Sequence, residues 1–113
     1  MESQVHIPER LSLKISQEAL VAICTHYRVH TLALFGSVLR NDFTSASDVD
    51  VLVTFLPEAP LTLFWLGGLK TALEDLFHRR VDLTHQPALK PFLQDTILTA
   101  KEVLYVQAIE PHG

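Results

Sequence analysis

Two aspartates two positions apart, Asp48 and Asp50, are the strongest candidates for chemistry in this sequence. They open a segment, residues 48–55, in which valines alternate with other residues, and this pattern predicts a strand. Because side chains two apart on a strand project from the same face, both carboxylates would point the same way. Carboxylates that close repel each other unless a cation lies between them, and hard oxygen ligands suit Mg²⁺. Taken alone, the pair also fits the solvated acidic start of a strand.

Gly36 and Ser37 are a candidate phosphate cradle. They follow a short apolar segment and precede a predicted short helix. Backbone amides at a helix N-terminus favour an anion, and glycine lets a phosphate approach the backbone closely. The serine hydroxyl would add a further donor. Taken alone, a Gly-Ser pair at the end of a strand also fits a plain turn.

Asp82 is a third acidic candidate, in a short predicted strand at residues 81–84 that follows Arg79 and Arg80. Taken alone, it fits the polar face of an edge strand, or a partner for one of the two arginines. Its combination with an acid pair and a phosphate cradle changes this interpretation. Carboxylates that hold two metal ions, together with donors for the phosphates, are what two-metal phosphoryl or nucleotidyl transfer requires.

The elements that must position these residues alternate between helices and strands, so we predict an α/β (α+β) fold with a small mixed sheet flanked by helices. One domain is expected to span residues 1–113. Apolar periodicity and capping signals predict the following elements in chain order: an irregular entry (1–14), a helix (16–27), a strand (31–35), a short helix (37–41), a loop (43–47), a strand (48–55), a helix (61–78), a strand (81–84), a helix opening at Pro91, and a final strand or extended tail (103–106).

Composition excludes several classes of protein. With 48% apolar and 19% charged residues, the chain of 113 residues is not a disordered, charge-dominated one. A net charge of -4 does not supply the basic footprint of non-specific nucleic-acid binding. The single cysteine, Cys24, permits no intramolecular disulfide and fits a reducing compartment. The longest apolar stretch, residues 61–69, is far shorter than the about 20 residues needed to span a bilayer. With no secretory signal at the N-terminus, we expect a cytoplasmic protein that does not enter membranes.

Taken together, the motifs resemble the signature of the minimal nucleotidyltransferases (MNT) of the DNA polymerase β superfamily. The resemblance covers about residues 16–106 and implies the nucleotidyltransferase fold. Asn41 stands where that family often has glycine, and Val38 where a basic residue is frequent. The residues that carry the resemblance are Gly36-Ser37, Arg40, Asp42, Ser47-Asp48-Val49-Asp50 and Val81-Asp82-Leu83.

The resemblance implies a role for each candidate residue. Gly36 and Ser37 would hold the phosphates of a nucleoside triphosphate, and Arg40 would either contact a phosphate or, slightly favoured, pair internally with an acid. One of the carboxylates, that of Asp82, would also help to deprotonate the attacking hydroxyl. The residues implied both in catalysis and as ligands of two Mg²⁺ ions are Asp48, Asp50 and Asp82.

The reaction implied by the resemblance is the transfer of a nucleoside monophosphate, AMP from ATP, to a hydroxyl with release of pyrophosphate. Stand-alone members of this size are antitoxins that modify a tyrosine of a HEPN-type ribonuclease toxin, which would be the protein partner. The alternative is a non-catalytic module that neutralises a partner by contact, against which the complete carboxylate set counts. An unrelated Asp-x-Asp site of the glycosyltransferase kind would need a far longer chain and would leave Gly36-Ser37 unexplained.

Leu63 and Phe64 are the apolar residues that are hardest to place in a core. On a helical wheel of residues 61–78, Leu63 falls among the polar side chains and Phe64 lies at the edge of the same arc. Either the first turn is not helical and both side chains are buried, or they form an exposed apolar patch for a partner or a second copy of the chain. A homo-oligomer is therefore left open.

Overall fold

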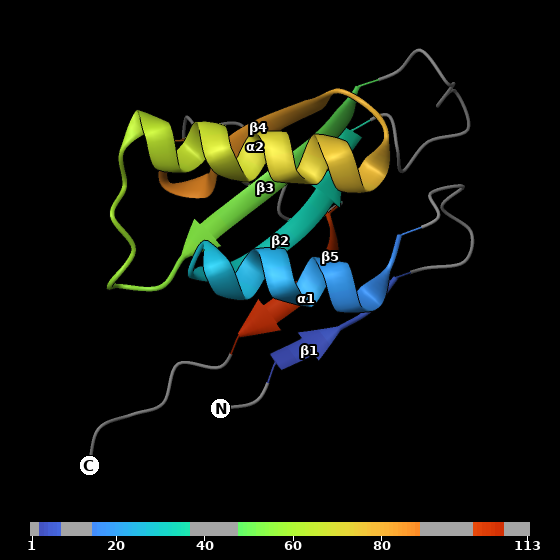
Figure 1. Cartoon of the computed structure of the whole chain (residues 1–113), viewed down its shortest axis with the longest axis horizontal. Helices are drawn as coiled ribbons and strands as arrows, with labels where there is room; N and C mark the ends of the chain where they lie inside the picture. The colour runs from blue at the N-terminus through green and yellow to red at the C-terminus, as the bar shows by residue number, and fades with distance from the viewer. Residues whose placement is uncertain (1–2, 8–14, 37–47, 89–100, 108–113) are drawn as a thin grey trace.

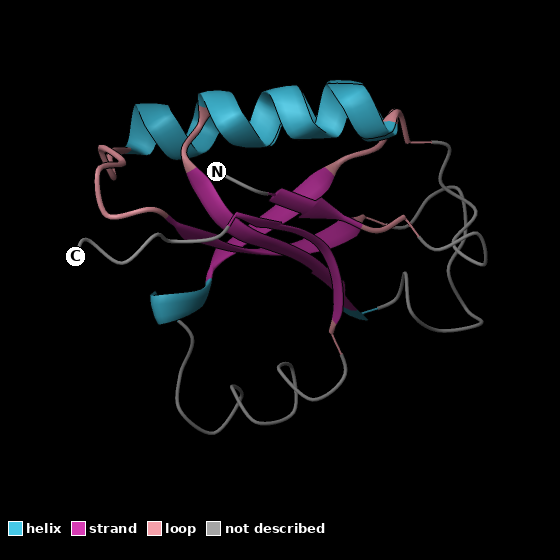
Figure 2. Ribbon diagram, turned by 90° about the horizontal axis from the view of Figure 1, so that it is seen from below, coloured by secondary structure: helices cyan, strands magenta, loops and turns pink. Residues whose placement is uncertain are grey.

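The computed structural model describes residues 3–7, 15–36, 48–88 and 101–107, which form a five-stranded sheet with two helices on one face (Figures 1 and 2). This confirms the predicted mixed sheet flanked by helices. The described elements are β1 (Ser3–Val5), α1 (Gln17–His26), β2 (Val29–Phe35), β3 (Val49–Phe55), α2 (Leu63–Phe77), β4 (Val81–His85), the 3-10 turn η2 (Gln86–Ala88) and β5 (Glu102–Gln107).

The strand order β1-β5-β2-β3-β4 brings three chain segments to one end of the sheet. β3 and β4 are parallel and are connected through α2, so both strands begin at the same end. β2 runs antiparallel to β3, so its last residues lie beside those two strand starts. The topology therefore gathers the end of β2 and the starts of β3 and β4, the segments that carry the candidate residues.

The core lies between the helices and the sheet. Val49, Val51 and Val53 of β3 point into it and are fully buried, as their alternation predicts. The residues between them on β3 therefore project from the opposite face of the sheet. The helical residues buried against the sheet are Leu20, Cys24, Leu69, Leu73 and Phe77.

The helix predicted at residues 16–27 is confirmed as α1. Ser16 is its N-cap, and its hydroxyl accepts a hydrogen bond from the amide of Ala19 at 3.2 Å. This contact satisfies one of the amides that a helix start leaves without a partner. In the described part of the chain, neither helix is long and apolar enough to cross a membrane.

α2 begins later than predicted. The threonine before it, Thr62, is the N-cap and accepts a hydrogen bond from the amide of Trp65 at 3.1 Å. Leu61, predicted to be the first residue of this helix, lies before it and is 55% exposed. Leu63 and Phe64 occupy the first helical turn, so the prediction that this turn could be irregular and buried is wrong.

The entry predicted to be irregular, residues 1–14, contains β1, so that prediction is wrong over three residues. β1 pairs antiparallel with β5 near the other end of the chain. A strand this short has no local pattern of its own and exists because a distant partner supplies its hydrogen bonds. The predicted short helix (37–41), loop (43–47) and helix opening at Pro91 lie outside the described residues.

Cys24 gives the fold a stability that depends on pH. Its side chain is fully buried on α1, and burial raises the pKa of the thiol from an ordinary 9.0 to about 12. Above pH 9 the unfolded chain loses this proton while the folded one keeps it, so stability is fully present below pH 9 and falls as the pH rises. Between pH 8 and pH 10.5 the expected loss is up to about 2 kcal/mol.

The measurement is urea unfolding at the two pH values. Cys24→Ala is the control, because it removes the titrating group and should lose less free energy of unfolding over the same interval. An equal loss in both proteins would contradict the assignment. The native thiol should also react with iodoacetamide at pH 8 far more slowly than the thiol of the unfolded chain.

Candidate active site

Asp50 of β3 and Asp82 of β4 lie side by side at the end of the sheet where both strands begin. They are register partners in the parallel pair. Their neighbours Val51 and Val81 are buried in the core, so both aspartates project from the face away from α1 and α2. Adjacent strands are about 4.8 Å apart, so the two carboxylates are neighbours whose repulsion favours a cation.

Gly36 lies directly against the Asp50 carboxylate. It follows Phe35, the register partner of Asp50 on β2, and has a φ of 73°. A Cβ at this position would collide with the Oδ2 of Asp50 and would lie 3.1 Å from its Cγ. The absence of a side chain therefore keeps the backbone close to the carboxylate, as a phosphate cradle beside a metal ligand requires.

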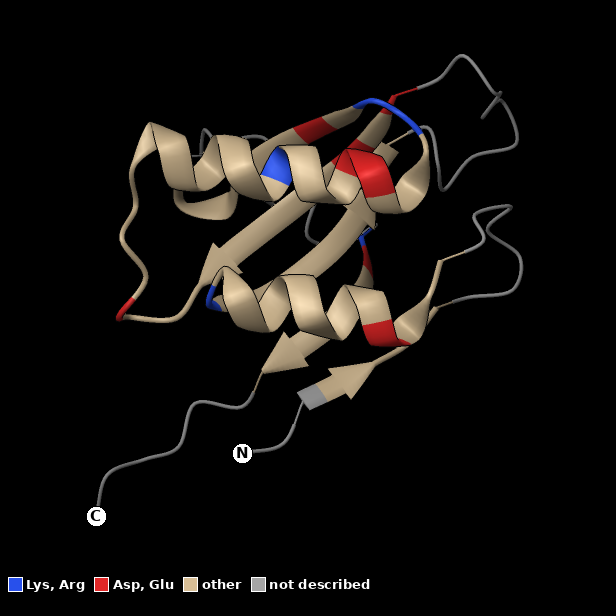
Figure 3. Ribbon diagram, in the orientation of Figure 1, with Lys and Arg blue, Asp and Glu red and all other residues tan. Residues whose placement is uncertain are grey.

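Asp48 forms an ion pair with Arg80. The Nε of Arg80 lies 3.2 Å from the Oδ1 of Asp48, and the two side chains are 80% and 49% exposed. The amide of Val49 also donates to the carbonyl of Arg80 at 2.9 Å, which ties the start of β3 to the residue before β4. Figure 3 shows acidic and basic segments adjoining at this end of the sheet. The sequence suggested that Arg79 or Arg80 could pair with Asp82, whereas in the structure Arg80 pairs with Asp48.

A carboxylate on α2 anchors the start of β4. The amide of Val81 donates to the Oε2 of Glu74 at 3.0 Å, and the Nζ of Lys70 lies 3.8 Å from the same oxygen. This contact holds the backbone between Arg80 and Asp82. Sequence analysis missed this role of Glu74. The spacing of Lys70 and Glu74 indicates a helix ion pair, but nothing local indicates the bond to a strand.

Of the predicted site residues that the structure describes, it brings together Gly36, Asp50 and Asp82. Asp48 lies at the same end of the sheet, directly before β3, and its carboxylate contacts Arg80. Ser37 and Arg40 lie outside the described residues. Within the described ranges, no three His, Cys, Asp or Glu side chains are close enough to hold a metal ion together. The Asp50 and Asp82 pair beside Gly36 fits a Mg²⁺ ion and its phosphate ligand in chemistry, because Mg²⁺ uses one or two carboxylates plus phosphates.

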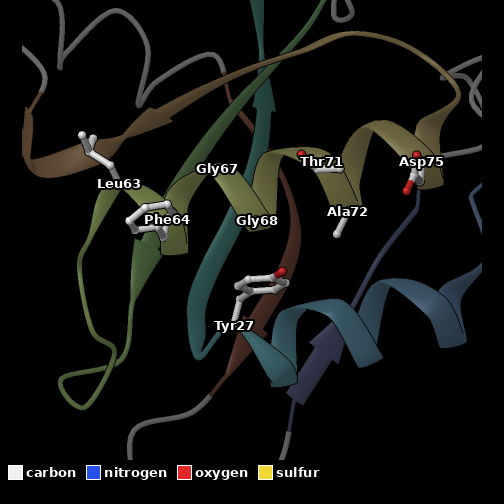
Figure 4. Close-up of a pocket in the computed structure, with 8 residues that line it drawn as sticks. All are labelled: Tyr27, Leu63, Phe64, Gly67, Gly68, Thr71, Ala72 and Asp75. Atoms are coloured by element: carbon white, nitrogen blue, oxygen red, sulfur yellow. The ribbon is translucent and has the colours of Figure 1, made fainter.

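A second feature lies on the opposite face, where an apolar surface extends over the first turn of α2. Leu63 and Phe64 are 87% and 93% exposed, which confirms the prediction of an exposed patch (Figure 4). Tyr27, from the end of α1, points towards Gly68, where a Cβ would lie 2.7 Å from the tyrosine hydroxyl. We call Leu61, Leu63 and Phe64 the α2 patch.

Known proteins share both the sequence pattern and the fold of this chain. Residues 18–110 match the family described as "Polymerase beta, Nucleotidyltransferase". The protein adenylyltransferase MntA of Thermococcus cleftensis is 39% identical over 80 residues, which cover 71% of this chain and 77% of that protein. A solved structure provisionally described as a minimal nucleotidyltransferase has 34% identity and a TM-score of 0.64, and the match covers 75% of this chain and 85% of that one.

A more distant structure shares the fold alone. It contains a tri-AMPylated HEPN toxin of Shewanella oneidensis in complex with an MNT antitoxin. The matching chain is 17% identical, with a TM-score of 0.57, and the match covers 80% of this chain and 70% of that one.

Proposed function

The chain belongs to the polymerase β nucleotidyltransferase family, and from this membership we propose that it transfers AMP from ATP to a hydroxyl on a protein partner. The observation that carries the proposal is the pairing of Asp50 with Asp82 in register, with Gly36 against the Asp50 carboxylate. The relative from Thermococcus cleftensis, named a protein adenylyltransferase, supports the nucleotide and the class of acceptor.

In this reaction, Asp48, Asp50 and Asp82 would hold two Mg²⁺ ions, which supply positive charge to the phosphates when bound. Gly36 and Ser37 would cradle the phosphates through their backbone amides. Arg40 would contact a phosphate or pair with an acid of the site.

The bond changes of the proposed transfer balance without a further reactant. The acceptor oxygen forms a bond to the α-phosphorus of ATP, and the bond from that phosphorus to the bridging oxygen breaks. Pyrophosphate leaves with the electron pair of that bond. The proton of the acceptor hydroxyl passes to the Asp82 carboxylate, which is exposed and therefore open to an incoming side chain.

We further propose that the acceptor is a tyrosine of a HEPN-type ribonuclease toxin and that the chain is its antitoxin. Support comes from the fold neighbour, an MNT antitoxin in complex with an AMPylated HEPN toxin. Neutralisation by contact alone is the second candidate function, which the exposed α2 patch favours.

The decisive experiment incubates the purified chain with the protein encoded beside it, Mg²⁺ and each of the four nucleoside triphosphates. Intact-mass measurement should show added AMP on the partner with ATP, and peptide mapping should locate it on tyrosine. A partner that is neutralised but gains no mass with any nucleotide would establish the contact function instead.

The α2 patch yields a prediction about binding. Leu63→Glu should leave the melting temperature within about 2 °C of the parent protein, because a side chain that is 87% exposed contributes little to the core. If the patch contacts the partner, the same change should weaken the complex by about 10-fold or more, the effect of losing a buried leucine side chain.

Calorimetric titration of the partner, together with a thermal melt, measures both effects. Leu69→Glu is the matched control on the same helix, because Leu69 is fully buried and its substitution should unfold the protein. Unchanged partner affinity in a folded Leu63→Glu variant would place the interface elsewhere.

A further inference from the structure

We propose that Arg80 is a built-in countercation of the active site: it holds Asp48 while no divalent cation is bound, and it turns to the phosphates of the nucleotide once Asp48 becomes a metal ligand. The identity of these phosphates rests on the proposed function. The ion pair between Arg80 and Asp48 is independent of the proposed function.

The peptide group that joins Arg80 to Val81 is held at both its carbonyl and its amide. Its carbonyl accepts the amide of Val49, and the next residue, Val81, donates to Glu74. The side chain therefore moves from a fixed base. The side chain extends from this base to the carboxylate of Asp48, the residue directly before β3. An arginine fixed at this point can exchange one contact of its guanidinium for another without any change in the sheet.

The ion pair between Arg80 and Asp48 is one that a divalent cation can displace. The Nε of Arg80 lies 3.2 Å from the Oδ1 of Asp48, and the two side chains are 80% and 49% exposed. Exposed ion pairs are weak, whereas the strong ones are shielded from water. A divalent cation that binds Asp48 would therefore release the guanidinium at little cost.

The guanidinium is also suited to the second contact that we propose for it, the one with the nucleotide phosphates. It carries five N–H donors in a planar fork that matches the geometry of a phosphate. Most of the side chain faces solvent while it contacts Asp48, so the guanidinium is accessible to a ligand. Once released from Asp48, the guanidinium would lie at the end of the sheet where β3 and β4 begin, close to Asp50 and Asp82 in the chain, where the nucleotide phosphates would meet the metal.

The test measures metal binding and nucleotide binding separately. Arg80→Gln, Arg79→Gln and the parent protein are titrated with Mn²⁺ alone, and binding is followed through the relaxation of water protons. Arg79 is the matched control because it is the neighbouring cation, is less exposed and has an interaction of its own. Its loss changes the net charge equally but leaves Asp48 paired.

The expected result is Mn²⁺ binding two to five times tighter in Arg80→Gln than in Arg79→Gln. In the presence of Mg²⁺, a non-hydrolysable ATP analogue should bind Arg80→Gln at least about fivefold more weakly than it binds the parent protein. Equal Mn²⁺ affinities in the two variants, or an unchanged affinity for the analogue in Arg80→Gln, would overturn the proposal.

The outcome is independent of the acceptor protein. If Arg80→Gln shows both shifts while no partner gains AMP, the proposed function fails and the countercation stands. If the partner is modified but neither shift occurs, the countercation fails alone.

Discussion

Asp50→Asn is expected to abolish nucleotidyl transfer while leaving the fold intact. Asp50 lies in register with Asp82, so the substitution removes one of the proposed metal ligands and also relieves the repulsion between the two neighbouring carboxylates. Metal charge contributes several kcal/mol to the stabilisation of the transition state, so the rate of transfer should fall by about 1,000-fold or more. The melting temperature should match or exceed that of the parent protein, because no buried apolar contact is lost.

The rate is measured as AMP gained by the partner over time, and folding as a thermal melt by circular dichroism. Glu58→Gln is the matched control: it removes a carboxylate in the exposed turn after β3, at the other end of the sheet. It should transfer AMP at the parent rate. Transfer by Asp50→Asn at more than about one hundredth of that rate would rule out the assigned role.

The parts of the fold that could be predicted from sequence are those governed by local pattern. The valines of β3 alternate, and the strand lies where they predict it. Ser16 caps α1 as its side chain and position indicate. β1 could not be predicted, because its hydrogen bonds come from β5, about 100 residues away. β2 begins two residues earlier than expected, directly after Arg28, whose φ of 56° ends the preceding turn.

The candidate site could be predicted as a set of residues but not as a set of contacts. The spacing of Asp48 and Asp50 predicts a shared face, yet only the parallel pairing of β3 with β4 brings Asp82 beside Asp50. The ion pair of Asp48 with Arg80 is likewise a consequence of that pairing. Periodicity alone left Leu63 undecided between core and surface. The cap at Thr62 and the packing of later turns determine its exposure.

Gly36→Ala should damage both the fold and the activity. An alanine at a φ of 73° is strained by about 1–2 kcal/mol, which corresponds to a melting temperature lower by about 5 to 15 °C. Its Cβ would also displace the carboxylate of Asp50, with which it would collide. Because misplacement of a catalytic group by about 1 Å can cost 100-fold in rate, transfer should fall by at least that factor.

Two variants separate these effects. Gly67→Ala, in the middle of α2 with no atom within 4 Å of the new Cβ, should raise stability by up to about 1 kcal/mol through helix propensity. In the double variant Gly36→Ala with Gly67→Ala, stability should be partly restored while transfer stays low, because the added helix propensity does not move the Asp50 carboxylate back. Recovery of transfer in step with the melting temperature would mean that Gly36 serves the fold alone. Recovery of stability without recovery of transfer would mean that Gly36 is needed to keep the Asp50 carboxylate in position.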